Sequence, residues 1–419
     1  MKYGLIGNPL GHSHSPYLHG KFGIDGYELH PLGKDELEEF FKRREFSSVN
    51  VTIPYKRDVM PLLDDIDPTA AECGAVNTVV NNGGKLTGYN TDVFGMDFAL
   101  KAADITLNGK KVVVLGSGGT SHTACTLARK SGAERVTVVS RTGEFNYDNL
   151  HLLSDAQVIV NATPVGMYPA IDARPVDLDK FPAVEGVFDA VYNPLRTEFV
   201  LQAQRKGIKH ASGLLMLSAQ AAAAAKIFKE GKYVPFTPDT EDGKAAICAC
   251  RDLEEKLTNV VLCGMPSSGK TTVGKLLAGM LGKTFVDTDE EICKATGKTI
   301  PEIFAEGGEP VFRKAESDVV REVAARQGLV IATGGGALLN PKNAELLKAN
   351  GYGVFLERDI ELLSTEGRPL SKNAETLRKM YLERLPIYKN FADCEADNNG
   401  CAEITAATVK EKYYESFGY

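Results

Sequence analysis

The chain has 419 residues, more than one hydrophobic core usually serves, so we expect two or three domains. Its net charge of −7 argues against a general nucleic-acid-binding protein, which needs a basic face, but is compatible with small anionic ligands. We find no signal peptide and no apolar run of membrane-spanning length, and therefore expect a cytoplasmic protein that binds neither nucleic acid nor membranes.

Strand-like and helical stretches alternate along the chain, which is the pattern of parallel α/β sheets. Residues 1–92 carry short strands and turn signals, and residues 93–212 have the pattern of a dinucleotide-binding unit. Residues 213–257 are helical and rich in alanine, so we expect them to pack back on the first block. A new strand, residues 259–263, opens the third block, residues 258–419.

Polar side chains stand at or after the strands of the first block. They are Ser13, Ser15, Thr52, Lys56, Asn77 and Asp92. Reduction of a ketone needs a hydride donor and a proton donor, and a desolvated lysine beside a carboxylate can serve as the second. Composition alone leaves Lys56 and Asp92 open to a plainer interpretation, an ion pair on the surface.

Histidines and cysteines invite a metal interpretation that their spacing does not support. His12, His14 and His19 lie together after the first strand, but their spacing suits no zinc site. Cys248 and Cys250 are close together in a helix-like stretch without a second cysteine or histidine cluster nearby, so we interpret them as reduced thiols.

A glycine-rich turn follows the strand at 111–115. Gly116 and Gly118 are the first two glycines of G-x-G-x-x-G and Gly119 follows at a variable position, but Ser121 replaces the third glycine of the motif. The next strand ends in Ser140-Arg141-Thr142, where a site that prefers NAD would place an acid. Because an arginine there suits a 2′-phosphate, we expect NADPH as the cofactor; an exposed basic turn is the alternative.

A second phosphate-binding motif follows the strand at 259–263. Gly264-Met265-Pro266-Ser267-Ser268-Gly269-Lys270-Thr271 fits G-x-x-x-x-G-K-[ST] and leads into a helical run that starts at Thr272. The backbone N–H groups of such a loop turn toward phosphate oxygens, and the helix N-terminus adds its positive dipole end. Lys270 can reach the β- and γ-phosphates, and the Thr271 hydroxyl can coordinate Mg²⁺.

Acids, glycines and arginines after the P-loop suggest a phosphoryl acceptor. Asp287 and Asp289 end the next strand, where one acid can hold the metal's water shell and the other can orient a hydroxyl for in-line attack. Further along the chain come Arg313, Gly334-Gly335-Gly336, Arg368 and Arg384. Together such residues suit a small anion bound beside the phosphates, although a single arginine more often forms a surface ion pair.

Residues 1–257 resemble shikimate dehydrogenase over essentially the full family length. The matching segments are Gly7-Asn8-Pro9, Ser13-His14-Ser15-Pro16, Asn50 to Lys56, Asn77, Asn90-Thr91-Asp92, Asn161-Ala162-Thr163-Pro164-Val165-Gly166-Met167, Tyr192, Gly213-Leu214-Leu215-Met216 and Gln220. The resemblance implies that Lys56 and Asp92 are the catalytic pair. It also implies a set of substrate-binding residues: Ser13, Ser15, Thr52, Asn77, Asp92, Tyr192 and Gln220.

The same resemblance implies where the NADP cofactor binds. The residues are Gly116, Gly118, Gly119, Ser140, Arg141, Thr142, Thr163, Met167 and Gly213. The family often adds a second basic residue shortly after the Ser-Arg-Thr triplet, whereas this chain continues Gly143-Glu144-Phe145-Asn146. We therefore expect a modest preference for NADP over NAD.

Residues 259–392 resemble shikimate kinase. The matching segments are Asp287-Thr288-Asp289, Ile303-Phe304, Gly308-Glu309, Phe312-Arg313, the triple glycine, Arg368-Pro369-Leu370 and Arg384-Leu385-Pro386-Ile387-Tyr388. The resemblance implies that Arg313 and Arg384 bind the carboxylate of shikimate and that Asp289 lies beside its 3-hydroxyl as base or orienting group. Gly335 completes this acceptor site, and Asp287 with Thr271 serves Mg²⁺.

The nucleotide site implied for this block uses Gly264, Gly269, Lys270, Thr271, Thr272 and Arg368. Arg368 belongs to a lid that closes over the phosphates. The lid is short, Leu363 to Gly367, and carries no arginine before Arg368 that could stack on adenine.

These resemblances imply an α/β architecture of two parts. A substrate-binding domain (1–92 and 213–257) and a Rossmann NADP-binding domain (93–212) precede a P-loop kinase domain (258–419) related to the nucleoside monophosphate kinases. The implied activities are consecutive: reduction of 3-dehydroshikimate with NADPH, then phosphorylation of shikimate with ATP and Mg²⁺.

Two alternatives remain at this point. The first is a quinate/shikimate dehydrogenase that uses NAD, fused to a small-molecule kinase. The second is a ligand-sensing scaffold in which one module has lost catalysis.

Overall fold

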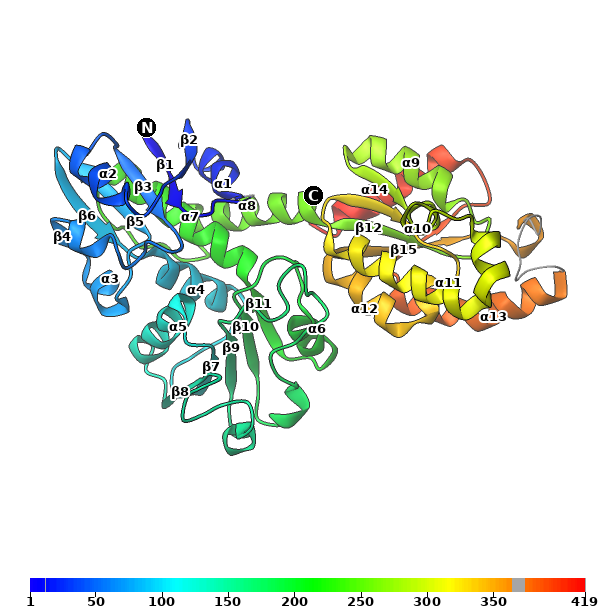
Figure 1. Cartoon of the computed structure of the whole chain (residues 1–419), viewed down its shortest axis with the longest axis horizontal. Helices are drawn as coiled ribbons and strands as arrows, with labels where there is room; N and C mark the ends of the chain where they lie inside the picture. The colour runs from blue at the N-terminus through cyan, green and yellow to red at the C-terminus, as the bar shows by residue number, and fades with distance from the viewer. Residues whose placement is uncertain (12, 364–373, 419) are drawn as a thin grey trace. The chain divides into compact units, whose positions relative to one another are not determined.

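The computed structural model describes residues 1–11, 13–363 and 374–418 of the chain (Figure 1). These residues form two compact units. The first contains Met1–Met167, Ala173–Asn193 and Phe199–Asp252, and the second contains Tyr168–Asp172, Pro194–Glu198 and Leu253–Tyr419. The main part of the second unit thus begins a few residues before the expected boundary at 257, and the expected domain limits stay predictions.

The first unit begins with a six-stranded sheet in the order β2-β1-β3-β5-β6-β4. Its strands are β1 (Tyr3–Gly7), β2 (Tyr27–Pro31), β3 (Ser48–Val51), β4 (Asp65–Ile66), β5 (Thr78–Asn82) and β6 (Lys85–Tyr89). Strand β1 is parallel to β2 and β3, but β5 is antiparallel to β3 and β6. The expectation of parallel sheets throughout is therefore wrong here, because the Asn81-to-Gly84 turn joins β5 and β6 as a hairpin.

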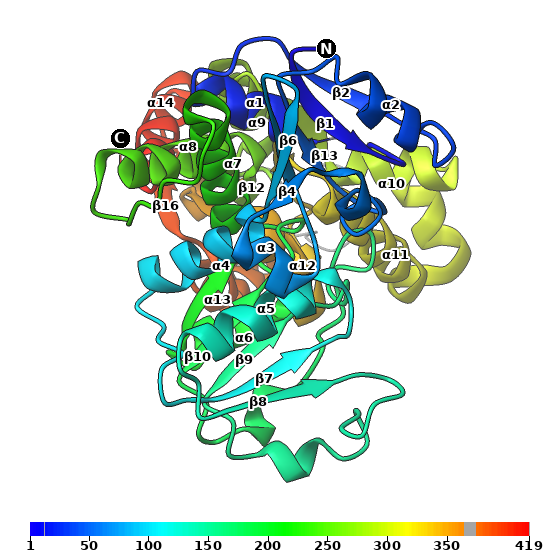
Figure 2. The ribbon, with the colours of Figure 1, turned by 90° about the vertical axis from the view of Figure 1, so that its left-hand side faces the viewer.

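The second sheet of this unit is parallel, in the order β11-β10-β9-β7-β8. Its strands are β7 (Lys111–Leu115), β8 (Arg135–Val139), β9 (Val158–Asn161), β10 (Gly186–Asp189) and β11 (Lys209–Ser212). Helix α5 (Gly119–Lys130) lies against β7 and β8, as Figure 2 shows, and α6 (Glu198–Arg205) follows β10 along the chain. This strand–loop–helix order is the Rossmann arrangement expected for residues 93–212.

The alanine-rich stretch forms α7 (Gly213–Glu230), which packs against α4 (Thr91–Ala102). Small side chains allow the close approach: a Cβ on Gly95 would lie 2.6 Å from the Met216 carbonyl oxygen. The end of α7 also packs on the first sheet, because Ile227 and Phe228 share a buried cluster with Leu5 of β1. The part of this stretch that forms α7 therefore packs on the first block, whereas residues from Leu253 onward belong to the second unit.

Four further helices complete the first unit and the entry to the second. They are α1 (Ser15–Lys21), α2 (Leu37–Arg43), α3 (Pro68–Cys73) and α8 (Glu241–Leu257). Short 3₁₀ turns are η1 (Met60–Leu62), η2 (Leu150–Leu153) and η3 (Leu178–Lys180).

The second unit is built on a parallel sheet in the order β13-β14-β12-β15-β16. Its strands are β12 (Asn259–Cys263), β13 (Thr284–Asp287), β14 (Leu329–Ala332), β15 (Gly351–Glu357) and β16 (Cys394–Asp397). Its helices are α9 (Lys270–Leu281), α10 (Thr288–Thr296), α11 (Ile300–Ala325), α12 (Pro341–Asn350), α13 (Ala374–Phe391) and α14 (Ala402–Glu415), with 3₁₀ turns η4 (Ala337–Leu339) and η5 (Ile360–Leu362).

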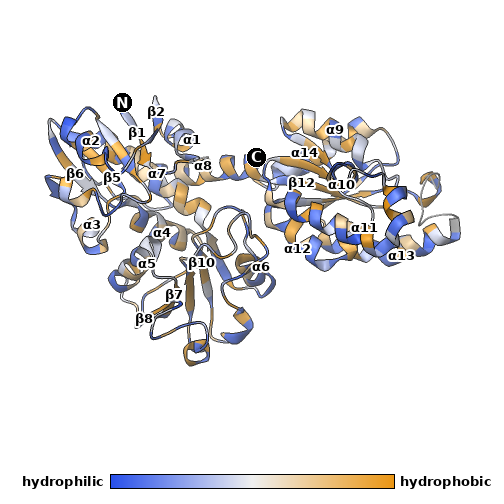
Figure 3. Cartoon of the chain, in the orientation of Figure 1, coloured by the Kyte–Doolittle hydropathy of each residue, from blue (hydrophilic) through white to orange (hydrophobic). Residues whose placement is uncertain are grey.

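Successive residues of β12 face two separate buried clusters. Val261 packs with Ile331 and Phe355 on one side of the sheet, and Val260 packs with Val330 and Val354 on the other. A strand that is buried on both faces consists of consecutive apolar residues. Figure 3 shows this as orange along the central strands. Within the described ranges, no helix has the length and apolar character needed to cross a membrane.

Candidate active sites

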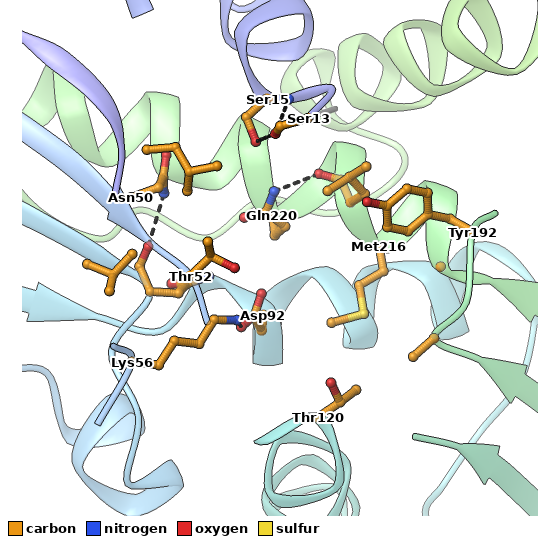
Figure 4. Close-up of a pocket in the computed structure, with 16 residues that line it drawn as sticks. Ser13, Ser15, Asn50, Thr52, Lys56, Asp92, Thr120, Tyr192, Met216 and Gln220 are labelled. Carbon is orange, nitrogen blue, oxygen red and sulfur yellow. Dashed lines mark hydrogen bonds and ion pairs between the residues drawn. The ribbon is translucent and has the colours of Figure 1, made fainter. Parts of the chain in front are cut away.

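A cavity of about 230 Å³ opens in the first unit. It is lined by Leu5, Ser13, Ser15, Asn50, Val51, Thr52, Lys56, Asn77, Asp92, Thr120, Ala190, Tyr192, Gly213, Met216, Leu217 and Gln220. Every residue predicted to bind the substrate of the reductase is in this set, as is Lys56 (Figure 4). Their roles stay predictions, but the structure brings them together from distant parts of the sequence.

Lys56 and Asp92 form an ion pair at the cavity wall. The Lys56 Nζ lies 2.7 Å from the Asp92 Oδ2, and the two side chains are 29% and 16% exposed. Asn90 caps α4 beside the pair: its Oδ1 accepts from the backbone N–H groups of Asp92 (3.0 Å) and Val93 (3.2 Å). Asp92 therefore lies in the first turn of α4, where the helix dipole favours a carboxylate. The pair is half-buried and faces a cavity, unlike an ordinary surface pair.

Amide side chains build the wall of the cavity behind the pair. The Asn77 Oδ1 accepts from the Thr91 backbone N–H at 2.8 Å, and its Nδ2 donates to the Thr91 Oγ1 at 3.0 Å. Asn50 is buried at the end of β3, where its Oδ1 accepts from the Tyr27 hydroxyl at 2.7 Å and its Nδ2 donates to the Thr78 Oγ1 at 3.0 Å. Such mutual hydrogen bonds hold the amides in fixed orientations.

Hydroxyl and amide groups reach the opposite side of the cavity. The Ser13 Oγ donates to the Ser15 Oγ at 3.1 Å, and the Gln220 Nε2 donates to the Leu217 carbonyl at 2.9 Å. Burial raises the pKa of the Tyr192 phenol, which therefore stays protonated as a hydrogen-bond donor. In Figure 4 the side chains of Ser13, Ser15, Gln220 and Tyr192 lie above and to the right of the Lys56–Asp92 pair, across the cavity.

Several lining residues were not assigned a role from the sequence. They are Leu5, Asn50, Val51, Thr120, Ala190, Met216 and Leu217. Asn50 and Met216 stand within segments that carry the family resemblance, so that signal could have marked them. Thr120 follows the two glycines of the Gly-rich turn, and only the fold places that turn beside the cavity.

Of the histidines that follow β1, His19 lies within α1 and is buried. His19 is 1% exposed and stacks on Tyr27 with ring centroids 4.1 Å apart. Burial lowers its pKa to about 3, so the ring is neutral at physiological pH. His12 lies outside the described residues, and the ranges that are described contain no group of three His, Cys, Asp or Glu able to hold a metal ion.

The Gly-rich turn between β7 and α5 has room for a dinucleotide. Gly116 has φ 109°, and a Cβ there would lie 3.0 Å from both the Ala162 oxygen and the Thr163 Cγ2, so a side chain would not fit. Gly118 caps α5 and Gly119 begins it, and a Cβ on either would meet nothing within 4 Å. Open space at a helix N-terminus fits the pyrophosphate of the cofactor.

The other predicted cofactor residues lie at the carboxyl edge of the same sheet. Arg141 is exposed directly after β8, between Ser140 and Thr142, and β8 is the neighbour of β7. Thr163 follows β9, and its Oγ1 donates to the Asn161 Oδ1 at 2.6 Å. Met167 is 45% exposed. Gly213 begins α7 and lines the cavity, so it stands between the substrate and cofactor regions.

In the second unit the P-loop joins β12 to α9 as predicted. Gly264 (φ 145°) and Gly269 (φ 92°) adopt conformations that favour glycine. The Lys270 Nζ donates to the carbonyls of Gly264 at 3.0 Å and Met265 at 2.8 Å, so the ammonium lies over the loop itself. Thr272 is exposed in the first turn of α9.

The predicted magnesium ligands lie next to each other. The Thr271 Oγ1 donates to the Asp287 Oδ2 at 2.8 Å, and the Asp287 Oδ1 accepts from the Asp289 backbone N–H at 3.0 Å. A hydroxyl and a carboxylate oxygen are hard donors of the kind Mg²⁺ takes alongside phosphate and water oxygens. The residues therefore fit the ion.

The acceptor residues converge near the triple glycine. The Arg384 Nη1 donates to the Gly335 carbonyl at 2.9 Å. A Cβ on Gly334 would lie 2.7 Å from the Asp289 Oδ1 and 3.0 Å from the Glu316 Oε1, which places both carboxylates at this turn. Arg313 joins them through its Nη1, 2.8 Å from the Glu316 Oε2.

Glu316 is a site residue that sequence reasoning missed. Its side chain is 1% exposed, and burial raises its pKa, opposed by Arg313 and reinforced by the charge of Asp289. Its position three residues after Arg313 on α11 was the available signal, because residues at i and i+3 share a helix face. Arg368 and the lid around it, residues 364–373, lie outside the described residues.

These two sites define the class of protein: a Rossmann-fold oxidoreductase followed by a P-loop phosphotransferase. Residues 5–79 match the family model of the shikimate dehydrogenase substrate binding domain, and residues 266–413 match that of shikimate kinase. A shikimate dehydrogenase (NADP(+)) of Clostridium perfringens is 37% identical over 247 residues, which cover 54% of this chain and 91% of the relative. One from Halothermothrix orenii is 37% identical over 258 residues and is 89% covered.

Solved structures agree with these matches. A chorismate mutase/shikimate 5-dehydrogenase fusion protein from Clostridium acetobutylicum has a TM-score of 0.56 at 36% identity, with 61% of this chain and 97% of that chain covered. Shikimate 5-dehydrogenase from Thermus thermophilus, in complex with NADP(H) and shikimate, has a TM-score of 0.52 at 34% identity, with 59% and 99% covered.

The chain belongs to the shikimate dehydrogenase family and carries a shikimate kinase domain after it. The predicted fusion of an oxidoreductase with a phosphotransferase is confirmed, as is its α/β fold class. The comparisons give no support to the quinate-type or scaffold alternatives.

Proposed function

We propose that the first unit reduces 3-dehydroshikimate to shikimate with NADPH and that the second phosphorylates shikimate at its 3-hydroxyl with ATP and Mg²⁺. The observation that carries the first half is the Lys56–Asp92 pair, 2.7 Å apart in a cavity lined with hydroxyls and amides. The second half rests on a P-loop whose acceptor edge holds an acid and two arginines.

In the reduction, NADPH supplies the hydride to the carbonyl carbon. Lys56 donates a proton to the ketone oxygen, so the C=O bond becomes a C–OH bond and the lysine becomes a neutral amine. Asp92 holds the Lys56 Nζ toward the cavity through their 2.7 Å ion pair. Solvent returns the proton to Lys56 afterwards.

The polar lining orients the cyclic acid so that its ketone meets Lys56. Substrate hydroxyls and carboxylate bind to the groups of Ser13, Ser15, Thr52, Asn77, Tyr192 and Gln220, which line the cavity. Because a site built to hydrogen-bond a hydroxyl strongly rejects an analogue that lacks it, this lining selects a polyhydroxylated ring.

In the phosphorylation, the 3-hydroxyl of shikimate attacks the γ-phosphorus in line with the departing ADP. Asp289 orients that hydroxyl and accepts its proton as the new P–O bond forms. Lys270 and the P-loop N–H groups stabilise the negative charge that develops on the phosphoryl oxygens. Arg313 and Arg384 bind the substrate carboxylate, and Thr271 and Asp287 would hold Mg²⁺. Arg368, which the resemblance also implies, lies outside the described residues.

The partners of the protein are small molecules. We propose a cytoplasmic enzyme that binds neither nucleic acid nor membranes, on the basis of its acidic charge and ordinary composition. The proposal that the enzyme uses NADPH rather than NADH rests on Arg141. This residue follows β8, which is the neighbour of the strand that precedes the glycine-rich turn.

A coupled assay tests the proposal. Dehydroshikimate, NADPH and ATP–Mg are supplied to the full chain, and shikimate and its 3-phosphate are followed over time. Both products should appear in sequence, and omission of ATP should stop the reaction at shikimate. A chain that leaves NADPH or ATP unconsumed under these conditions lacks the corresponding half of the function.

A further inference from the structure

Three polar side chains of the second unit meet behind the P-loop. They are Ser268, Arg358 and Asn398, and among the described residues their Oγ, Nε and Oδ1 atoms are buried without a hydrogen-bond partner. Ser268 and Asn398 are each 1% exposed. A buried polar atom without a partner destabilises the fold, so such a cluster beside a phosphate-binding loop calls for a functional explanation.

The fold places these groups against Gly269. Asn398 follows β16, and its Nδ2 donates to the Ser268 carbonyl at 2.7 Å, while its backbone N–H donates to the Glu357 carbonyl at 2.8 Å. A Cβ on Gly269 would clash with the Asn398 Nδ2 and would lie 3.7 Å from the Arg358 Nη1. Asn398 thus fixes the P-loop backbone, and the guanidinium of Arg358 lies beside that same point.

Arg358 differs from the arginines of the acceptor site in having no partner among the residues that the structure describes. Arg313 pairs with Glu316 at 2.8 Å, and Arg384 donates to the Gly335 carbonyl at 2.9 Å. The Arg358 guanidinium, by contrast, makes no ion pair or hydrogen bond with any residue in the described ranges. A half-buried cation without a counter-charge next to a P-loop can form charge-assisted hydrogen bonds with an anionic ligand.

The order of the strands gives the direction in which that ligand extends. In β13-β14-β12-β15-β16 the P-loop follows the central strand β12, and the acceptor residues Asp289 and Gly335 follow β13 and β14. The transferred phosphoryl group faces them, so the rest of the nucleotide extends toward β15 and β16. Arg358 follows β15 directly and therefore stands on the nucleotide side.

We propose that Arg358 binds the α-phosphate of the nucleotide, with Asn398 holding the P-loop in position beside it. The inference deepens the proposed kinase function and rests on it. Arg358 supplies a cation on the nucleotide side of the site, where the sequence of the lid offers none before Arg368.

The test compares Arg358→Met, Arg358→Lys and a control, Arg326→Met, in the full chain. Arg326 is exposed after α11, at the amino edge of the sheet near the start of β14. We expect Arg358→Met to raise the KM for ATP about tenfold and to weaken binding of inorganic tripolyphosphate by a similar factor. The KM for shikimate should change less than twofold, and Arg358→Lys, which keeps a point charge, should recover most of the affinity.

Unchanged dehydrogenase activity and an unchanged melting temperature show that the variants fold. A KM for ATP within twofold of wild type in Arg358→Met overturns the proposal. So does weaker ATP binding with unaltered tripolyphosphate binding, because that pattern indicates contact with the base instead. Failure of the wild-type chain to use ATP at all would overturn the proposed kinase function, which is a different result.

Discussion

The two active sites hold their polar groups in different ways. In the first unit, neutral amides and hydroxyls bond to one another: Asn50 to Thr78 at 3.0 Å, and Asn77 to Thr91 at 2.8 Å. In the second unit the groups are mostly charged, and Lys270 lies on the carbonyls of its own loop. A neutral, mutually bonded lining keeps its shape when the ligand arrives, whereas the charges of the P-loop site must exchange partners.

This difference predicts how sensitive each site is to loss of one group. In the first unit the hydrogen-bonded cavity lining is in place before the substrate binds, so the rate of reduction depends mainly on the single group that transfers a proton. Phosphoryl transfer depends instead on positioning and on charge spread over several groups. Variants of matched chemistry in the two units can test that contrast.

The largest effect is expected for Lys56→Met. The variant keeps the apolar stem but cannot donate a proton, so kcat of the reductase should fall about 10³-fold, while kinase activity stays unchanged. Lys85→Met is the control, because Lys85 is 60% exposed and pairs with Asp65 at 2.9 Å away from the cavity. Steady-state oxidation of NADPH measures the rate; a loss below tenfold would remove Lys56 from its assigned role.

Asp289→Asn should reduce kcat of the kinase by a smaller factor, about 10²-fold. Asparagine can still orient the 3-hydroxyl but cannot take its proton, and proton transfer contributes little in a loose transition state. The exposed neighbour Glu290 provides a control as Glu290→Gln. Phosphate transfer to shikimate is the readout, with NADPH oxidation as the check on folding. A loss as large as that of Lys56→Met would contradict the contrast between the sites.

His19, which is buried against Tyr27 in the first unit, gives a pH-dependent prediction. Its pKa is about 6.5 unfolded and about 3 folded, so the unfolded chain binds more protons between these values. The stabilisation is therefore complete above pH 6.5 and is lost as pH falls toward 3. Between pH 7 and pH 5 the loss amounts to about 2 kcal/mol.

His19→Phe should remove this part of the acid sensitivity while keeping the stack on Tyr27 and Phe228. Urea unfolding of the first unit at pH 7 and pH 5 measures the difference in the free energy of unfolding. The same replacement at His30, a partly exposed histidine of β2, controls for the loss of any histidine. If His19→Phe loses as much stability as wild type on acidification, His19 is not the responsible group.

Motifs that are continuous in the sequence were predicted well. The P-loop, the Gly-rich turn and the strand ends at Asp287 and Asp289 are local patterns, and the structure places each after its strand. Lys56 and Asp92, 36 residues apart, needed the family resemblance, because nothing local shows that they form a 2.7 Å pair. A motif that is continuous in the sequence can be identified without the structure, whereas a contact between distant residues becomes visible only in the folded chain.

The features that the sequence did not predict also depend on tertiary contacts. The Tyr27–Asn50–Thr78 bonds join the strands β2, β3 and β5, and no spacing in the sequence indicates that one sheet brings these strands together. The antiparallel β5–β6 hairpin was missed although residues 1–92 show turn signals, because the alternation of strands and helices suggested parallel sheets throughout. The Glu316 carboxylate depends on the depth of α11 in the core, which helix periodicity alone did not reveal.

The smallest effect concerns the cofactor. Arg141→Ala should raise the KM for NADPH about tenfold and leave the KM for NADH within twofold, because only NADPH carries the 2′-phosphate. Arg135→Ala is the matched control: Arg135 starts β8 at the opposite edge of the sheet and pairs with Asp155 at 2.5 Å. Initial rates at 340 nm (about the nicotinamide band) with both cofactors give the ratio. Equal losses with NADPH and NADH would mean that Arg141 maintains the conformation of the turn and does not bind the 2′-phosphate. The preference for NADPH over NADH would then depend on uncharged groups, like those that line much of the substrate cavity.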